Sequence, residues 1–196
     1  LATDEERTAV CCLSSVNLEE FDEWQDNPHF IPDLIEMLDN VLNHFIEKAP
    51  ESLRRAVYSA ANERSIGLGA MGFHAYLQRR NIPFEHFMAK TANIRIFKHI
   101  KSQAVATTER LARERGACPD DTSGRVRNAH LLAVAPNASS SIICGNTSPS
   151  IEPYRANAFT QKTKSGSSLL KNEYLEHILQ ELDMDTPDVW KSIVTN

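Results

Sequence analysis

The stretch that decides the fold is Ala133-Val134-Ala135-Pro136-Asn137-Ala138-Ser139-Ser140-Ser141-Ile142-Ile143-Cys144. The apolar run over residues 130–135 predicts a buried strand, which Pro136 ends because proline has no N–H to donate. The serines then begin a short apolar segment that predicts one helical turn. Such a junction directs backbone N–H groups and hydroxyls to one point, where the helix dipole favours an anion. From spacing alone, a phosphate or carboxylate cradle and a plain serine-rich helix cap both remain open.

The composition sets broad limits on the class of protein. With 196 residues, 41% of them hydrophobic and 24% charged, the chain is typical of a folded globular protein. A net charge of −5 gives no general attraction to nucleic acid or to an anionic membrane, so a nucleotide site would have to be local. No apolar run approaches the roughly 20 residues of a membrane span, and no signal peptide opens the chain. Because it starts with Leu1, we expect an interior or C-terminal fragment of a longer protein.

Around this stretch, the sequence predicts strands that alternate with helices, which favours an α/β class with crossover connections. The helix over 85–115 is long and amphipathic, and Gly116 and Pro119 end it. Past Pro153 we expect a loop and a hairpin that reaches Gly166. The expected strands are 9–16, 66–71 and 130–135, and the other expected helices are 31–46, 50–62, 172–182 and a short one through Phe73, Tyr76 and Leu77.

The cysteines indicate a reducing compartment, so we expect a cytoplasmic protein. Cys11, Cys12, Cys118 and Cys144 have neither metal-ligand spacing nor a secreted disulfide pattern. The seven histidines are scattered as well, and we assign no metal. If residues 9–16 form a strand, Cys11 and Cys12 point to opposite faces, and one of them is then buried and inert.

A glycine motif raises the alternative that the chain binds a dinucleotide. Gly67-Leu68-Gly69-Ala70-Met71-Gly72 matches the G-x-G-x-x-G spacing of dinucleotide-binding proteins. An arginine-containing helical segment precedes it, and no strand ending in an acidic residue follows about 20 residues later, as that fold requires. Close packing of a strand against its neighbours is the better interpretation.

Four motifs in the same order carry a resemblance to a known family. They are the segments 9–18 (AVCCLSSVNL), 64–69 (RSIGLG) and 116–119 (GACP), and the pair 136–141 (PNASSS) with 146–153 (NTSPSIEP). Over about residues 8–171 the chain resembles the large, catalytic subunit of class I ribonucleoside-diphosphate reductase. The resemblance implies that the chain is part of a ten-stranded α/β barrel with long amphipathic helices.

The resemblance also implies a function and a domain organisation. The parent enzyme would reduce ribonucleoside diphosphates to deoxyribonucleoside diphosphates by radical chemistry, for DNA precursor synthesis. Residues 1–196 would form one partial catalytic barrel domain, with the allosteric region, the finger loop and the C-terminal tail elsewhere. We therefore expect the chain alone to be inactive.

Site residues follow from the same resemblance. Cys11 takes the position of one member of the redox-active pair that reduces the ribose 2′ carbon, and Cys12 is its inert neighbour. The second cysteine of the pair lies upstream in the family. The residues that match the substrate diphosphate-binding segment, P-S-E-T-S-S in the common pattern, are Pro136, Asn137, Ala138, Ser139 and Ser140. Ala138 replaces the acidic residue, which affects only contacts that the acid itself made.

The implied partners are all outside this chain. A small subunit would supply the radical, a thioredoxin- or glutaredoxin-type protein would supply electrons, and the parent would be a homodimer. ATP and dNTP effectors would bind elsewhere in the parent, and the chain itself would hold no cofactor. Two alternatives stay open. One is a cobalamin-dependent reductase with the same barrel, and the other is a non-enzymatic α/β phosphate-binding module in which the thiols only pack.

Overall fold

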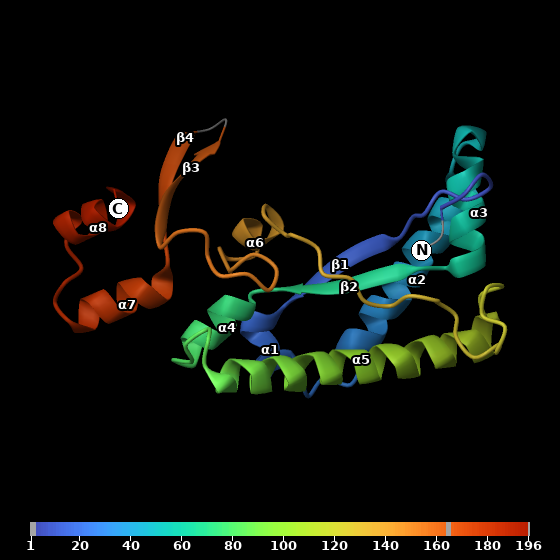
Figure 1. Ribbon diagram of the computed structural model, residues 1–196, viewed down its shortest axis with the longest axis horizontal. Coiled ribbons are helices and arrows are strands. Elements are labelled where there is room, and N and C mark those ends of the chain that lie inside the picture. Colours follow the sequence, from blue (N-terminus) through green and yellow to red (C-terminus); the bar gives the residue numbers. More distant parts are fainter. Residues whose placement is uncertain (1–2, 164–165, 196) are drawn as a thin grey trace.

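The computed structural model describes residues 3–163 and 166–195. Its centre is a parallel pair of strands, β1 (Cys12–Asn17) and β2 (Ile66–Met71), aligned from Cys12 opposite Ile66 to Asn17 opposite Met71. The long helices α2 (Phe30–Lys48) and α5 (Phe87–Arg115) cover one face of this sheet (Figure 1). The shorter elements of the body are η1 (Leu18–Glu20), α1 (Phe21–Trp24), η2 (Glu51–Leu53), α3 (Arg54–Glu63), α4 (Phe73–Arg79) and α6 (Ser140–Ile143).

The main core lies between this sheet and the two long helices. Apolar side chains that recur every three or four residues on α2, such as Ile31, Ile35 and Leu42, are at most 1% exposed. Ile66 and Leu68 of β2 belong to the same cluster. The expectations of a helix over 31–46, a strand over 66–71 and a long helix over 85–115 are confirmed. The helix expected over 50–62 is present as η2 followed by α3.

The strand expected over residues 130–135 is largely wrong. This segment runs beside β2 in a parallel direction, but it forms only one isolated bridge, Leu68 to Leu132. The N–H groups of Ile66 and Leu68, two residues apart, donate to the adjacent carbonyls of His130 and Leu131. Because the pairing slips by one residue, a regular ladder cannot continue. The segment still extends the sheet to a third position beside β2.

A buried ion cluster fixes the amino ends of these strands. Asp39 of α2 is 1% exposed, and its Oδ1 accepts from Arg64 Nη2 at 2.8 Å and from Asn128 Nδ2 at 3.0 Å. Arg115 at the end of α5 and Arg127 lie 3.3 and 3.5 Å from the same carboxylate. Burial opposes ionisation of Asp39, but the hydrogen bond and charge of Arg64, with Arg127 and Asn128, outweigh it and hold its pKa below the usual value.

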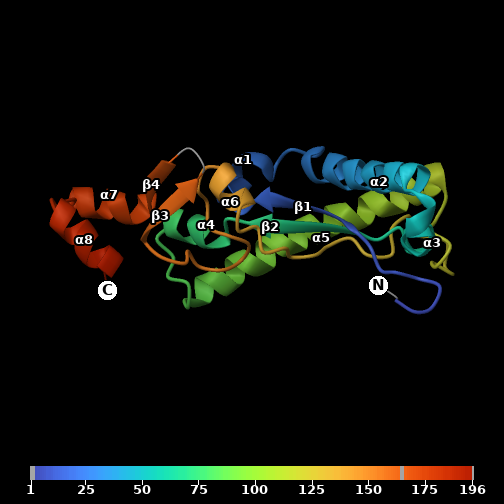
Figure 2. The same ribbon diagram turned by 90° about the horizontal axis from the view of Figure 1, so that it is seen from above.

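The C-terminal part lies to one side of the body (Figures 1 and 2). It has an antiparallel hairpin, β3 (Ala158–Thr163) and β4 (Gly166–Lys171), and two helices, α7 (Glu173–Glu181) and α8 (Pro187–Thr195). Ala158, Leu179 and Trp190 form its own small core. The helix over 172–182 is confirmed, whereas the hairpin continues five residues past Gly166. We did not expect α8.

The structure confirms the α/β class but does not show the expected ten-stranded barrel. In residues 3–163 and 166–195, the strands form two separate two-stranded sheets, so this part of the chain contains no closed barrel. A mixed arrangement of helices and parallel strands is nevertheless the unit from which α/β barrels are built. In the same residues, no helix is both long and apolar enough to cross a membrane.

Candidate functional site on the open face of the sheet

The two faces of β1 differ in what covers them. Val10, Cys12 and Val16 contact the core under α2 and α5. Since side chains alternate along a strand, Leu13 and Ser15 point to the opposite side, and continuing this alternation to the residue just before β1 assigns Cys11 to that side as well. We call that side the open face and define it by Cys11, Leu13, Ser15, Gly67, Gly69 and Ala133.

Both adjacent cysteines are half-buried, so the expectation that one of them is fully buried is not met, and what distinguishes Cys12 is its contact with the core. The Cys12 thiol packs against the core, and burial, followed by the neighbouring Cys11, raises its pKa. A thiol with a raised pKa is a poor source of the reactive thiolate. On the open face, the nearby Leu13 is 53% exposed. Cys11 directly precedes β1, is half-buried, and is not among the side chains of the main core cluster.

The glycine motif shapes the open face. A Cβ at Gly69 would lie 2.3 Å from the carbonyl oxygen of Ala133, and a Cβ at Gly67 would lie 2.8 Å from the Ala133 side chain. Gly72 has a positive φ of 81°, and a Cβ there would lie 2.3 Å from Asn17 Oδ1. These glycines let neighbouring backbone approach closely. The structure thus supports close packing as the role of this motif, in place of dinucleotide binding.

The segment Pro136 to Ser140 lies at the carboxyl ends of β1 and β2. Asn137, with a positive φ of 52°, anchors it there. Its side-chain Nδ2 donates to Ser15 Oγ at 2.9 Å, to the Ala135 carbonyl at 3.0 Å and to the Ala70 carbonyl at 3.2 Å. We predicted that Asn137 contributes to a phosphate site. Its side chain is used to hold the segment on the sheet, so such a contribution is indirect.

The next three residues have unused hydrogen-bond donors. Ala138, Ser139 and Ser140 are exposed. Within the residues that the structure describes, their backbone N–H groups donate to no partner, and neither serine hydroxyl forms a hydrogen bond. The helix that follows, α6, has only four residues, so its dipole is small. Anion binding here would therefore rest on individual N–H and O–H donors, which corrects our emphasis on the helix dipole.

The structure places Cys11 and the 136–140 segment at two ends of the open face. Asn137 contacts Ser15 of β1, which lies four residues after Cys11, the residue just before that strand. At roughly 3.3 Å per residue, this spacing separates the two by about 13 Å. The two predicted parts of the site therefore do not touch. An extended ligand could contact both, one end on each.

A cavity beside the segment adds residues that sequence reasoning missed. Its volume is 280 Å³, and its wall includes Ala138, Ser141, Asn146, Tyr154, Arg155 and Phe159. The loop on its far side is fixed to the end of β2, because the Gly72 N–H donates to the Ser148 carbonyl at 2.7 Å. The motif at 146–153 was visible in the sequence only as a family signature. Nothing in its residue types indicated that it would line a cavity.

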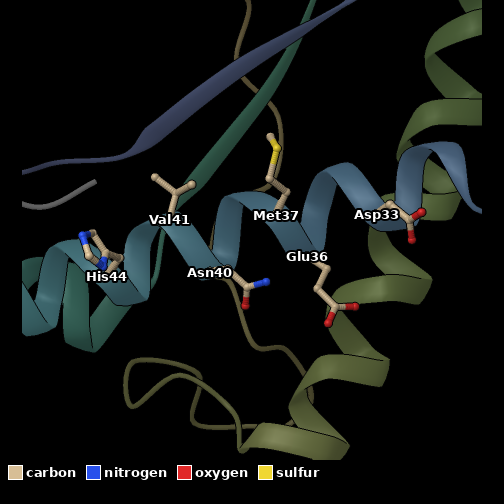
Figure 3. Close-up of a pocket in the computed structure, with 6 residues that line it drawn as sticks. All are labelled: Asp33, Glu36, Met37, Asn40, Val41 and His44. Carbon is tan, nitrogen blue, oxygen red and sulfur yellow. The ribbon is translucent and has the colours of Figure 1, made fainter.

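A second hollow lies on α2 (Figure 3). It measures 540 Å³ and is lined by Asp33, Glu36, Met37, Asn40, Val41 and His44. Glu36 is already paired with Arg110 at 2.7 Å and with Arg115. Because α2 packs on the core side of the sheet, this hollow belongs to a different layer from the open face. In the described ranges, no group of three or more His, Cys, Asp or Glu side chains is arranged to hold a metal ion.

Comparison with known proteins gives a consistent result. The family model described as ribonucleotide reductase, barrel domain, matches residues 1–125 and 122–196. The chain is 54% identical to the ribonucleoside-diphosphate reductase large subunit of Invertebrate iridescent virus 6, over 100% of this chain and 21% of the relative. It is 35% identical to a vitamin B12-dependent ribonucleoside-diphosphate reductase of Mycobacterium tuberculosis, over 77% of this chain and 23% of the relative.

A solved structure agrees with these relatives. The chain matches the Actinobacillus ureae class Id ribonucleotide reductase alpha subunit with a TM-score of 0.88 and 38% identity, over 98% of this chain and 35% of that subunit. The chain thus spans about a fifth to a third of the length of these relatives. The family model covers it from end to end. The chain therefore belongs to the ribonucleotide reductase family and corresponds to part of the barrel domain.

Proposed function

We propose that this chain is part of a catalytic subunit that reduces ribonucleoside diphosphates to deoxyribonucleoside diphosphates. The open face would line the inside of a ten-stranded barrel. Cys11 would be one of two reducing cysteines, and Pro136 to Ser140 would hold the substrate diphosphate. The single observation that supports this proposal is the contact of Asn137 with Ser15, which joins the segment with the unused donors to the open face of β1, the strand that Cys11 directly precedes.

The chemistry assigned to Cys11 is a two-electron reduction. Cys11 and a second cysteine each give up an S–H bond and form one disulfide, which releases two electrons and two protons. The ribose 2′ carbon accepts the electrons and one proton, and its hydroxyl leaves as water with the other. Cys12 is unsuited to this role because it packs into the core on the other side of the strand.

The proposed partners follow from this chemistry. A small subunit would generate the radical that starts the reaction, and a thioredoxin- or glutaredoxin-type protein would reduce the disulfide after each turnover. The parent would be a homodimer that binds ATP and dNTP effectors outside this chain. All four cysteines of the chain are free thiols, which suits a reducing, cytoplasmic compartment.

A cobalamin-dependent reductase is the second candidate. The observation that favours it is the 35% identity to the vitamin B12-dependent reductase named above. The 54% identity to a viral large subunit and the match to a class Id subunit favour a reductase that works with a small subunit. Reduction that requires added small subunit and proceeds without cobalamin would decide between them.

The test of the proposed function compares two adjacent cysteines in the full-length subunit. Cys11→Ser should fold and bind substrate normally but lose multiple turnover, because a hydroxyl cannot form the disulfide. Cys12→Ser is the matched control and should keep turnover while losing about 1–3 kcal/mol of stability from polar burial. The measurement is deoxynucleotide formed per subunit in the presence of a dithiol. Sustained turnover by Cys11→Ser, or its loss only in Cys12→Ser, would contradict the assignment.

A further inference from the structure

The charges on helix α5 change in kind along its length. Near its carboxyl end they are paired, since Arg110 lies 2.8 Å from Glu114 one turn later and 2.7 Å from Glu36 of α2. Over residues 86–108, by contrast, the sequence has four lysine and arginine residues and no aspartate or glutamate. The amino-terminal part of α5 is therefore cationic in a chain whose net charge is −5.

Three of these four cations have no partner. The ammonium groups of Lys90, Lys98 and Lys101 are exposed and form neither an ion pair nor a hydrogen bond with any residue that the structure describes. The fourth cation, Arg95, is used within the body, since its Nη2 donates to the Tyr76 hydroxyl at 2.6 Å. At roughly 100° per residue, the three lysines fall within an arc of about 80° around the helix, so they form one row of positive charge.

Two large apolar side chains lie in the same row. Phe87 is 73% exposed and Ile94 is 55% exposed, and both fall within the arc of the lysines. Figure 1 shows α5 at the lower edge of the molecule, where its outer side faces away from the sheet and from α2. We call Phe87, Lys90, Ile94, Lys98 and Lys101 the α5 row.

A hollow at the amino end of the row has room for an apolar side chain. It measures 430 Å³, and the rings of Phe73, Phe84 and Phe87 line it together with Lys90. A cavity of about 150 Å³ accepts a benzene ring, so this hollow can take an aromatic or long aliphatic side chain. Glu85 also borders the hollow and disfavours a carboxylate inside it.

The row and the hollow together define the chemistry of a complementary ligand. It needs negative charges spaced along the lysines and one apolar group at the end of the row. Lys90 and Lys101 are eleven residues apart, which is about 17 Å along a helix. An extended polypeptide covers this distance with about five residues. An acidic peptide segment with one apolar anchor therefore matches both the charge and the length.

Two other anionic ligands fit less well. A helix that lies on a membrane has its apolar residues on one face and its charges on the other. On α5, Phe87 and Ile94 share a face with the lysines, while the opposite face is buried in the core through residues such as Ile96 and Ile100. A nucleic acid would leave the aromatic hollow unused, and the net charge of −5 does not attract it.

We propose that the α5 row and its hollow form a docking surface for an acidic segment of a separate protein. The carboxylates of the segment would pair with the three lysines, and its aromatic or long aliphatic anchor would enter the hollow beside Phe84 and Phe87. Permanent interfaces are apolar and poor in lysine, so a row of three lysines and two apolar residues suits a reversible contact. The surface lies across the sheet from the open face, and the inference does not depend on the proposed function.

The test measures binding of a labelled synthetic peptide to the full-length subunit by fluorescence anisotropy. The peptide has a central phenylalanine with aspartates on both sides, so that it can bind in either chain direction. Lys90→Glu combined with Lys98→Glu should lower the affinity about tenfold or more, because two attractive contacts become repulsive. Lys48→Glu combined with Lys191→Glu is the matched control, because these lysines are exposed elsewhere and the net charge changes equally. The control should bind the peptide as the unmodified subunit does.

The anchor is tested by changing the peptide. A peptide with serine in place of phenylalanine should bind about tenfold more weakly, because it leaves the hollow unfilled. Equal melting temperatures of the two double variants show that both are folded. The proposal is overturned if the unmodified subunit does not bind the peptide, if the two double variants bind it equally, or if the serine peptide binds as well as the phenylalanine peptide. Binding of phosphatidylserine vesicles or single-stranded DNA in place of the peptide, lost in Lys90→Glu with Lys98→Glu, would also overturn it.

Discussion

The two faces of the β1–β2 sheet use the same strands for different purposes. On the core face, Val16, Ile66 and Leu68 are at most 3% exposed and pack under the long helices. On the open face, Gly67 and Gly69 let a third segment approach closely, and the half-buried Cys11 lies just before β1. Alternation along one strand therefore allows stability and chemistry to be encoded by neighbouring residues.

The two ends of the sheet differ in whether their polar groups have partners. At the amino ends, the Asp39 carboxylate has a full set of cationic and amide partners. At the carboxyl ends, the donors of residues 138–140 and the Arg155 guanidinium have none within the described chain. Buried polar groups with complete partners hold a structure together, whereas unused donors at an exposed edge are available to a ligand. The comparison predicts that substitutions at the two ends affect different quantities.

The largest expected effect is the loss of the buried ion cluster. Asp39→Ala should lower the free energy of unfolding by about 3–5 kcal/mol, because it leaves buried arginines without their counter-ion. Asp22→Ala is the control, since Asp22 also pairs with two arginines, Arg80 and Arg95, but at the surface. It should cost about 1 kcal/mol or less. Urea unfolding of both variants makes the measurement, and equal losses would contradict the account of the cluster.

A smaller effect is expected on the open face. Gly69→Ala would place a Cβ 2.3 Å from the Ala133 carbonyl oxygen, so the segment at 131–133 must move. Overpacking of this kind costs about 1–3 kcal/mol. Because the segment leads directly to Pro136, we also expect weaker binding of a nucleoside diphosphate by the full-length subunit. Calorimetric titration with CDP and thermal unfolding test the two parts, and an unchanged melting temperature would show that the close approach is not needed.

The smallest expected effect concerns pH. The pKa of Asp39 is lower in the folded protein than in the unfolded chain, so the unfolded chain binds the proton more readily. The stability that Asp39 contributes is therefore complete above about pH 4 and declines as the pH falls through the lower, folded pKa. Asp39→Asn cannot titrate, and the difference in unfolding free energy between the two proteins should shrink on acidification. A difference in unfolding free energy that is constant from neutral to strongly acidic pH would show that ionised Asp39 does not contribute this stability.

Much of the fold could be predicted because its signals are local. Helix α2 follows from regular apolar spacing and α5 from its length and its stop at Gly116, while β2 agrees with the predicted bounds 66–71. The contact of Cys12 with the core agrees with the period of a strand, whereas β1 begins at Cys12 and not at residue 9 as expected. The family could be recognised because its motifs keep their order along the chain.

The remaining features depend on contacts between distant residues. The one-residue slip in the pairing of residues 130–131 with β2 is set by the hydrogen bonds of Ile66 and Leu68. The spacing of apolar residues in the sequence cannot predict such a slip. Asn137 has a structural role because Ser15 and Ala70 lie within reach, 122 and 67 residues away in sequence. The cavity next to Ser141 exists only after two loops have met. Sequence reasoning could not place Arg155 in it, because an isolated arginine after a proline-rich motif has no periodic context.

The most direct test of the central claim is to find which cysteine becomes oxidised when the full-length subunit turns over once. CDP is converted with the small subunit but without external reductant, free thiols are alkylated, and the peptides are mapped by mass spectrometry. The account predicts that Cys11 enters a disulfide in proportion to deoxynucleotide formed, while Cys12 on the core face stays a free thiol. A disulfide at Cys12, or product formed while Cys11 remains a free thiol, would contradict it.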